Sequence, residues 1–299
     1  MHSRMIHIGK ILLVALLVMS CTSCARWREA KAVVKEADSL LVYGNIIEDT
    51  AVLAATINTF SGPMGYVFAR NDLAKAYYHM ARNFYHAHDY ATAADYYILC
   101  DRLNPTDPMY KGRVNSCMGF LCKQDSCFEE ALEFYKRSSC AFKESGNEWY
   151  YAHNLLNVAE RYIYLNEFAK VDSVLREAAL YYVDSAYYAR LMDMSGFSLF
   201  RQQQYDSALV YFQKGLDYWW SEEDKCFSYL KIMQSYYFGA KDINNAIPYA
   251  RLLVKHSTNP NYLSNAYYCL MQDAKNKGDA ELLSKYSHAR TDTQKLLRD

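Results

Sequence analysis

Proline and glycine are scarce in this chain. Its 299 residues include 5 prolines and 11 glycines, while 52% of the residues are hydrophobic. So few turn-forming residues exclude a β-sandwich or barrel, because many short strands need turn residues at frequent intervals. Hydrophobic material for a packed core is ample. The composition therefore predicts a globular and mostly helical protein.

Net charge is also absent. The sequence has 33 basic and 33 acidic residues, and loss of an N-terminal segment with Arg4 and Lys10 would leave a net charge of −2. Proteins that bind nucleic acid usually carry a basic surface or a high pI, so the charge balance argues against that class. Tyrosine, by contrast, is abundant, with 29 copies against 13 phenylalanines. So many amphipathic rings predict half-buried helix faces and contact surfaces.

Familiar catalytic motifs are missing as well. The sequence has no G-x-S-x-G, H-E-x-x-H, P-loop or glycine-rich dinucleotide turn. Carboxylates such as Glu177 stand at the spacing of an ordinary solvated helix surface. We therefore predict a protein that is not an enzyme and that needs no cofactor.

The first twenty residues resemble an export signal. A positively charged segment, MHSRMIHIGK, precedes the apolar run ILLVALLVM and then SCTSC. That run is too short for a permanent membrane-spanning helix, which needs about 20 residues. The residues LVMSC resemble the lipobox of bacterial lipoproteins, apart from the methionine at position 19.

The lipobox resemblance implies that residues 1–20 are removed and that Cys21 becomes the lipid-modified N-terminus. Cys24 is the alternative lipid acceptor, and cleavage of a plain signal peptide without lipid addition is the competing interpretation. A lipid would anchor the protein in the bacterial cell envelope, where we expect it on the periplasmic face of the outer membrane. The expected partners then include a membrane, reached through this lipid, and no nucleic acid.

Pairs of small residues twelve positions apart recur along the rest of the chain. Successive copies are 36 to 40 residues apart, and two weaker copies follow four clear ones. In the clear copies the pairs are Ala81 and Ala93, Gly119 and Ala131, Ala159 and Val171, and Gly196 and Ala208. An ordinary amphipathic bundle shares the 3.6-residue period but not this recurrence. The pattern therefore predicts a repeat array.

This pattern resembles the tetratricopeptide repeat (TPR), in which small residues let two antiparallel helices approach closely. The resemblance implies an all-α fold, a TPR-like right-handed α-solenoid of antiparallel helix pairs. Six repeats would fill residues 66–296, at about 74–107, 112–145, 152–185, 189–222, 227–260 and 263–296. Residues 21–65 would form a tether and a divergent capping helix pair, and residues 297–299 a tail. We predict no second domain.

In TPR proteins the inner helix of each pair lines a concave groove. Transferred to this sequence, the groove positions are rich in aromatic residues and carry scattered positive charge. The candidate partner-binding residues are Tyr78, Arg82, Tyr85, His86, Phe120, Lys123, Tyr164, Phe197, Phe200, Arg201, Lys231 and Phe238. Such anchors can each contribute about 2 kcal/mol when fully desolvated at an interface.

Two considerations limit this interpretation. Phe197, Phe200 and Phe238 could instead pack against neighbouring helices as core residues. The asparagines that accompany lysine in carboxylate-binding TPR grooves are missing from the corresponding positions. A carboxylate-specific groove is therefore not expected.

Histidines and cysteines cluster without forming a recognisable metal motif. His79, His86, His88 and Asp89 lie within eleven positions, but the repeat alignment puts the last two in a turn. Cys117, Cys122 and Cys127 are five residues apart, and five residues turn a helix by about 500°, so they do not share a face. We expect no metal site and buried, reduced thiols. A disulfide between Cys100 and Cys117 is the alternative in an exported protein.

Together these features predict a membrane-anchored TPR scaffold in the bacterial cell envelope. It would bind a protein or peptide through an aromatic concave groove. The alternative is an envelope module that binds a carbohydrate or small molecule, because tyrosine-rich grooves can stack sugars.

Overall fold

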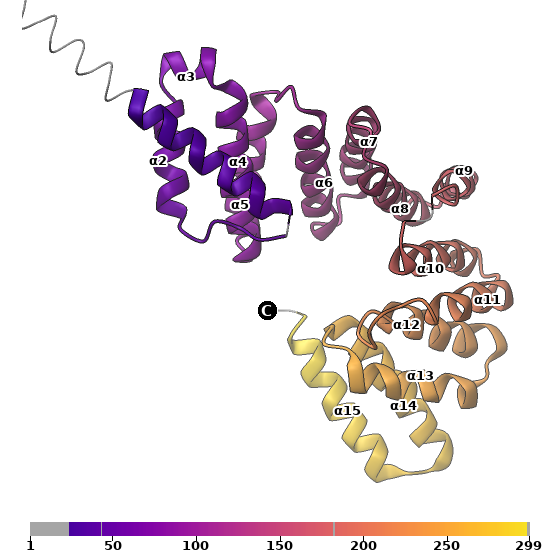
Figure 1. Cartoon of the computed structure of the whole chain (residues 1–299). Coiled ribbons are helices and arrows are strands. Elements are labelled where there is room, and N and C mark those ends of the chain that lie inside the picture. The colour runs from indigo at the N-terminus through magenta and orange to yellow at the C-terminus, as the bar shows by residue number, and fades with distance from the viewer. Residues whose placement is uncertain (1–23, 43, 182, 298–299) are drawn as a thin grey trace, which may run out of the picture. The chain divides into compact units, whose positions relative to one another are not determined.

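The computed structural model describes residues 24–42, 44–181 and 183–297 (Figure 1). These residues form helices and no strand, which confirms the predicted all-α, TPR-like right-handed α-solenoid. The predicted signal peptide and Cys21 lie outside the described residues. The chain divides into two compact units, Met1–Asn147 and Glu148–Asp299. We predicted no such division, and it falls inside the repeat array.

The first unit starts with a helix over residues 24–42 and contains two antiparallel helix pairs of the repeat type. Its further helices are α2 (Thr50–Phe60), α3 (Pro63–Phe68), α4 (Arg70–His86), α5 (Tyr90–Arg102), α6 (Pro108–Gln124) and α7 (Phe128–Glu144). The pairs are α4 with α5 and α6 with α7. They overlap the first two predicted repeats.

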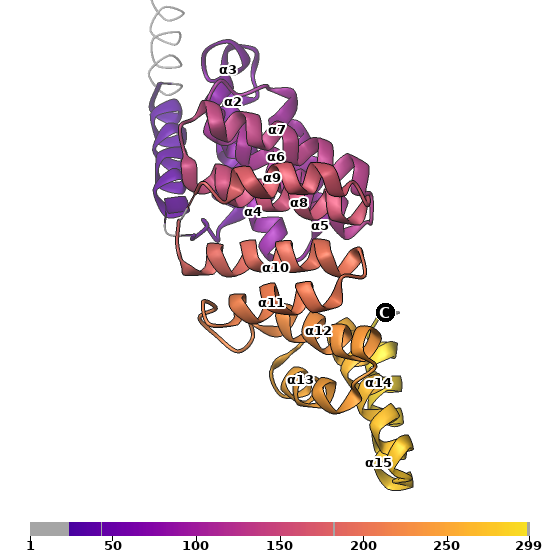
Figure 2. The same cartoon turned by 90° about the vertical axis from the view of Figure 1, so that its right-hand side faces the viewer.

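The second unit contains four helix pairs, and Figure 2 shows its later helices stacked in chain order. The helices are α8 (Glu148–Tyr164), α9 (Phe168–Ala178), α10 (Ser185–Arg201), α11 (Tyr205–Leu216), α12 (Cys226–Ser235), α13 (Ile243–His256), α14 (Pro260–Lys277) and α15 (Ala280–Lys295). A π-helix, η1 (Tyr236–Ala240), continues α12. The inner helices are α8, α10, α12 and α14; α10 contacts α8 and α12, and α12 contacts α14.

The turn inside each of the six helix pairs holds one residue with left-handed backbone geometry. These residues have φ between 51° and 68° and are His88, Ser126, Asn166, Gln203, Lys241 and Gly278. A left-handed residue just after a helix reverses the chain within a few positions. The side chain that follows can then cap the next helix: in the first turn, the Asp89 carboxylate accepts a hydrogen bond from the Thr92 N–H at 3.1 Å. The repeat period is therefore visible in the positions of the turns as well as in those of the helices.

Small residues do lie where paired helices cross. A Cβ added to Gly196 on α10 would lie 2.9 Å from two ring carbons of Phe212 on α11. The Phe212 ring is fully buried against this bare backbone, and Ala208 one turn earlier on α11 is fully buried too. Any larger residue at Gly196 would push the two helices apart.

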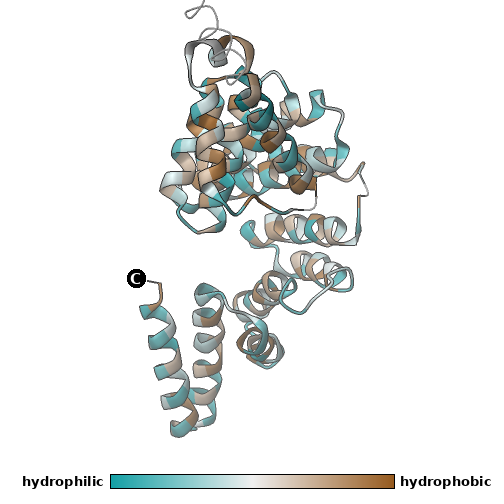
Figure 3. Cartoon of the chain, turned by 60° about the vertical axis from the view of Figure 1, so that its left-hand side comes forward, coloured by the Kyte–Doolittle hydropathy of each residue, from teal (hydrophilic) through white to brown (hydrophobic). Residues whose placement is uncertain are grey.

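Apolar residues recur along every helix and alternate with polar ones (Figure 3). In the first unit they join the helix over residues 24–42 to the repeats, because its Ala30 and Val34 are buried in the same core as Leu53 of α2 and Leu73 of α4. The helix over residues 24–42 and α2 thus pack against the first repeat, and α2 contacts α4 directly. The N-terminal end of the described chain is therefore held against the first unit.

Candidate functional site

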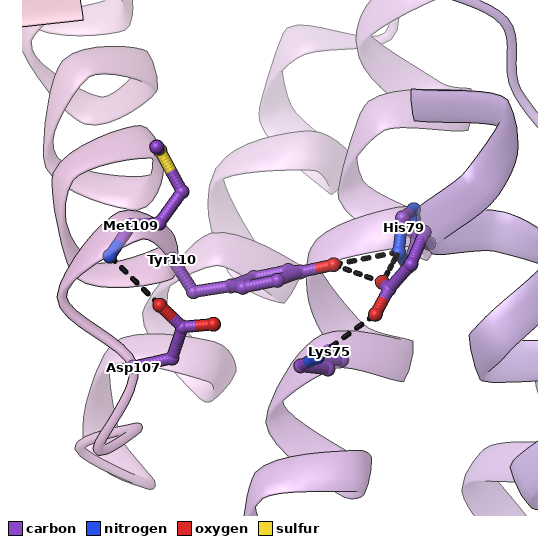
Figure 4. A network of polar contacts seen from close by, with 6 residues as sticks. Lys75, His79, Asp107, Met109 and Tyr110 are labelled. Carbon is purple, nitrogen blue, oxygen red and sulfur yellow. Dashed lines mark hydrogen bonds and ion pairs between the residues drawn. The ribbon is translucent and has the colours of Figure 1, made fainter. Parts of the chain in front are cut away.

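A polar network fixes the helix over residues 24–42 to the repeats of the first unit. The Asp38 carboxylate receives the Lys75 ammonium at 2.8 Å and lies 2.9 Å from His79 Nε2. Tyr110 of α6 donates its hydroxyl hydrogen to the same carboxylate, and Figure 4 shows Tyr110, His79 and Lys75 converging. Burial alone would raise the pKa of Asp38, but these hydrogen bonds together lower it to about 2. Burial also lowers the pKa of His79.

His79 therefore serves as a structural residue. Its ring nitrogen is committed to Asp38 and Tyr110, and its side chain is buried. Within the part of the chain that the structure describes, no group of three His, Cys, Asp or Glu side chains is arranged to hold a metal ion. Cys100 and Cys117 are free thiols.

The predicted partner-binding residues of the first unit divide into buried and accessible ones. Tyr78 is 4% exposed and packs edge-on against Tyr110 at 5.1 Å between ring centroids. Its place in the core corrects the prediction that it faces a partner. The Arg82 guanidinium donates hydrogen bonds to the carbonyl oxygens of Gly44 and Asn45, at 3.1 and 3.0 Å. Arg82 therefore holds the segment that follows the helix over residues 24–42.

The other four predicted residues of the first unit are at least partly exposed to solvent. His86 is exposed at the end of α4, and Tyr85 contacts Phe120 of α6 at 5.5 Å between ring centroids. Tyr85, Phe120 and Lys123 are half-buried. Burial raises the pKa of Tyr85 to about 12, so its hydroxyl stays protonated. The result is a small aromatic surface that also carries one lysine.

The second unit brings more of the predicted residues together, around Lys231 of α12. The Lys231 ammonium lies 4.7 Å from the ring centroid of Phe197 and 4.9 Å from that of Phe200, both on α10. Phe227, one turn earlier on α12, is 5.7 Å away. A cation over aromatic faces is attracted by their negative quadrupole. Burial, with a smaller contribution from Arg201, lowers the pKa of Lys231 to about 8.

Arg201 and Tyr164 extend this cluster toward α8. The Arg201 guanidinium donates a 2.8 Å hydrogen bond to Asn166 Oδ1 and lies 5.8 Å from the Tyr164 ring centroid. Tyr164 in turn contacts Phe197 edge-on at 5.5 Å. We call Tyr164, Phe197, Phe200, Arg201, Phe227 and Lys231 the basic aromatic cluster. It spans the inner helices α8, α10 and α12.

The two cations of the cluster, Lys231 and Arg201, each donate a hydrogen bond to a side-chain amide oxygen. Lys231 donates to Gln234 Oε1 at 3.2 Å, as Arg201 does to Asn166. Among the described residues, neither cation forms an ion pair with a carboxylate within 4.0 Å. Two neighbouring positive charges with neutral partners make a surface suited to an anionic group.

The structure also places two predicted residues differently from our expectation. Phe197 is 2% exposed, so it supports the cluster from beneath and does not itself reach a partner. Phe238 is 54% exposed on η1, but it lines a separate cavity of about 440 Å³ with Tyr237 and Lys241. Phe200 and Tyr164 are half-buried and remain accessible at the cluster surface.

Two residues near the cluster, Phe227 and Asp193, are not among the predicted partner-binding residues. Phe227 occupies no groove position in the repeat alignment, so no sequence signal selected it. Asp193 on α10 is almost fully buried and accepts hydrogen bonds from Ser228 Oγ at 2.6 Å and Trp219 Nε1 at 3.2 Å. Burial raises the pKa of Asp193 to about 7. Only the fold shows that this carboxylate is enclosed.

Comparisons with known proteins support the fold. The APC/C hetero-tetramer Cut9–Hcn1 contains a chain that superposes with a TM-score of 0.60 and 16% identity over 93% of this chain and 52% of that one. This chain thus spans about half the length of that neighbour. A tetratricopeptide repeat protein from Parabacteroides merdae gives a TM-score of 0.57 with 12% identity, covering 91% of this chain and 98% of its own. The quorum sensor NprR from B. thuringiensis, in its apo form, gives 0.59 with 9% identity, covering 89% and 87%.

These identities are low, so the likeness shows the TPR fold alone. No family model matches the sequence, and no curated protein matches it either. In the residues that the structure describes, none of the helices combines the length and the apolarity that crossing a membrane requires.

Proposed function

We propose that this chain is a lipid-anchored scaffold of the bacterial cell envelope that binds a protein segment on the basic aromatic cluster. The observation that carries the proposal is the pair Lys231 and Arg201, set among aromatic rings with neutral hydrogen-bond partners. Aromatic and arginine side chains are the residues that most often dominate protein interfaces. An acidic residue of the partner would supply the missing counter-charge.

The burial of Lys231 makes this complementarity effective. A pKa of about 8 means that burial disfavours the charged form of the Lys231 ammonium in the free chain. A partner carboxylate would offset that cost and would pair with a cation that is already desolvated and positioned. This mode differs from the lysine and asparagine carboxylate clamp, whose asparagines the sequence lacks.

Binding is tested by changing the cluster and leaving the fold intact. A photo-crosslinking residue at Phe200 should capture a protein partner in intact cells, and Lys231→Gln with Arg201→Gln should reduce that capture at least tenfold. Arg176 on α9 is exposed and offers a matched control, since Arg176→Gln removes a positive charge elsewhere in the same unit. Equal capture in the double variant and the control would refute the proposed surface.

The envelope location rests on the sequence alone and has its own test. Cys21→Ala should abolish incorporation of labelled palmitate and release the protein into the soluble fraction. If Cys24 is the acceptor, Cys24→Ala should have that effect and Cys21→Ala should not. Membrane retention and label in the variant with both cysteines replaced would refute lipid anchoring at either cysteine.

A second function, carbohydrate binding, is favoured by one observation at another edge of the second unit. Trp149 and Trp220 are 45% and 74% exposed, and their indole N–H groups donate to Asp184 Oδ2 at 3.4 Å and to Ser185 Oγ at 2.6 Å. One face of the Trp149 ring is already stacked on His153, at 3.9 Å between ring centroids. The more exposed Trp220 indole is held at its polar edge, and its apolar face can stack on the apolar face of a sugar ring.

A glycan array separates the two functions. Binding to a glycan that Trp220→Ala abolishes and Lys231→Gln leaves unchanged would favour the carbohydrate function. Trp219, which is half-buried and donates to Asp193, is unsuitable as a control. Tyr211→Ala on α11 removes an exposed ring elsewhere in the unit and serves that purpose.

A further inference from the structure

The short helix α3 exposes three consecutive large apolar residues. Tyr66 is 52% exposed, Val67 is 71% exposed and Phe68 is 65% exposed. Single exposed apolar residues are normal on protein surfaces, but a contiguous apolar projection marks a contact surface. Nothing in the packing of the first unit requires these three residues to be apolar, because none of them is buried.

The fold holds α3 firmly in place. A Cβ added to Gly65 would lie 1.8 Å from the Phe60 carbonyl oxygen, so the backbone of α3 packs directly against the end of α2. Ala69, just after α3, is 2% exposed and anchors the other end. The apolar side chains of Tyr66, Val67 and Phe68 therefore project from a backbone that is held in place at Gly65 and Ala69.

Helix α3 lies at the end of the first unit where the described chain begins. Trp27, near the start of the helix over residues 24–42, packs edge-on against Phe60 at 5.7 Å between ring centroids. Phe60 is also the residue whose backbone meets Gly65 of α3. Figures 1 and 2 both show α3 at the same end of the unit as the start of that helix.

The proposed lipid anchor would bring a membrane to this end. From Cys21 to residue 24 an extended chain spans at most about 11 Å, and with Cys24 as the acceptor there is no spacer. Since the helix over residues 24–42 is packed into the core of the first unit, the whole N-terminal end of that unit must lie close to the headgroups. Arg26 and Arg28 are exposed there and suit an anionic surface, although Glu29 partly offsets them.

We propose that Tyr66, Val67 and Phe68 form a membrane-contacting surface that inserts among the lipid headgroups beside the N-terminal anchor. The proposal rests on the lipid anchoring proposed above. Contact at a second point would fix the orientation of the first unit on the membrane, which a single flexible lipid attachment does not do.

Photo-crosslinking in the full-length protein in native membranes tests this surface. A diazirine-bearing residue at position 67 should form adducts whose mass matches phospholipid, with a yield at least fivefold higher than at position 210. Val210 on α11 is 63% exposed and lies in the second unit, so it matches Val67 in size and exposure. A second probe at position 66 guards against a local effect of the substitution and should behave as position 67 does.

Other adducts, or equal lipid yields, would overturn the proposed surface. Adducts from position 67 to a protein partner, to a second copy of this chain or to residues 1–23 would identify a different occupant. Equal lipid yields at positions 67 and 210 would show no specific contact. Labelled palmitate is followed in the same samples: label without lipid adducts refutes this surface alone, while adducts without label refute the lipid anchor and keep the surface.

Discussion

Asp193 should make the second unit more stable in mild acid than at alkaline pH. Its carboxylate is almost fully buried, and burial raises its pKa from 3.8 to about 7. Hydrogen bonds from Ser228 and Trp219 oppose that shift, as does the nearby Arg190. Below pH 7 the folded chain therefore binds a proton that the unfolded chain, with an ordinary aspartate pKa, does not bind.

The sign and size of the effect follow from this difference. Proton uptake on folding stabilises the folded state as the pH falls, so this stabilisation is complete below pH 3.8 and lost as the pH rises through about 7. Between pH 8 and pH 5 the free energy of unfolding should rise by about 2.7 kcal/mol from this residue, at 1.36 kcal/mol per pH unit below the folded pKa.

Asp193→Asn provides the matched comparison. The protonated acid can donate from one oxygen to Ser228 and accept from the Trp219 N–H with the other, and an asparagine reproduces this pattern without a charge. The variant should be more stable than wild type at pH 8 and should lack this pH dependence. His153, whose pKa is lowered by burial, is present in both proteins, so its contribution cancels in the comparison.

Urea unfolding at pH 5, 6, 7 and 8, followed by tryptophan fluorescence, measures the effect. Three of the four tryptophans, Trp149, Trp219 and Trp220, belong to the second unit, so the signal reports mainly on it. If the stability difference between wild type and Asp193→Asn stays constant to within about 0.5 kcal/mol over this range, an uncertainty typical of such extrapolations, the reasoning is wrong.

Three further predictions concern stability and thiol chemistry. Asp38→Asn should destabilise the first unit by about 2 kcal/mol at pH 7, because hydrogen bonds stabilise the charged Asp38 carboxylate. Faster hydrogen exchange in the helix over residues 24–42 would measure this loss. In wild type, the free energy of unfolding should fall by the same amount as the pH falls from 4 to 2. Gly196→Ala should lower stability by about 1 to 3 kcal/mol in thermal unfolding, and adding Phe212→Leu should reduce that cost, whereas equal costs in both backgrounds would contradict the close approach. Intact mass measured without reductant should show Cys100 and Cys117 unbridged, and a loss of two protons would contradict this.

The repeat architecture could be predicted because its physical cause is local in sequence. Two helices can cross closely only where a small residue faces a large one, as Gly196 faces Phe212, and this requirement recurs every 36 to 40 positions. The repeat alignment placed His88 in a turn, but the left-handed backbone of the turns could not be predicted with the same ease. Five of their six left-handed residues, including His88 and Asn166, are not glycine, so the usual marker of such a turn is absent.

The candidate site was predicted only in part. The repeat alignment selected Lys231, Phe200 and Arg201 by their positions on inner helices, and the structure brings them together. It did not reveal that Tyr78 and Phe197 are buried, because burial depends on rings supplied by other repeats. Tyr110 covers Tyr78, and Phe227 covers Phe197, from helices about thirty residues away.

The sequence by itself determined the all-α repeat fold, since helix periodicity and small residues at crossings act between near neighbours in the chain. Tertiary structure alone decided which polar groups are enclosed and which apolar groups are left outside. The Asp193 carboxylate and the Lys231 ammonium are desolvated because elements far apart in the chain pack around them. Val67 stayed exposed because α3 packs through Gly65 and Ala69 instead. Solvent access at these positions is a property of the assembled helices.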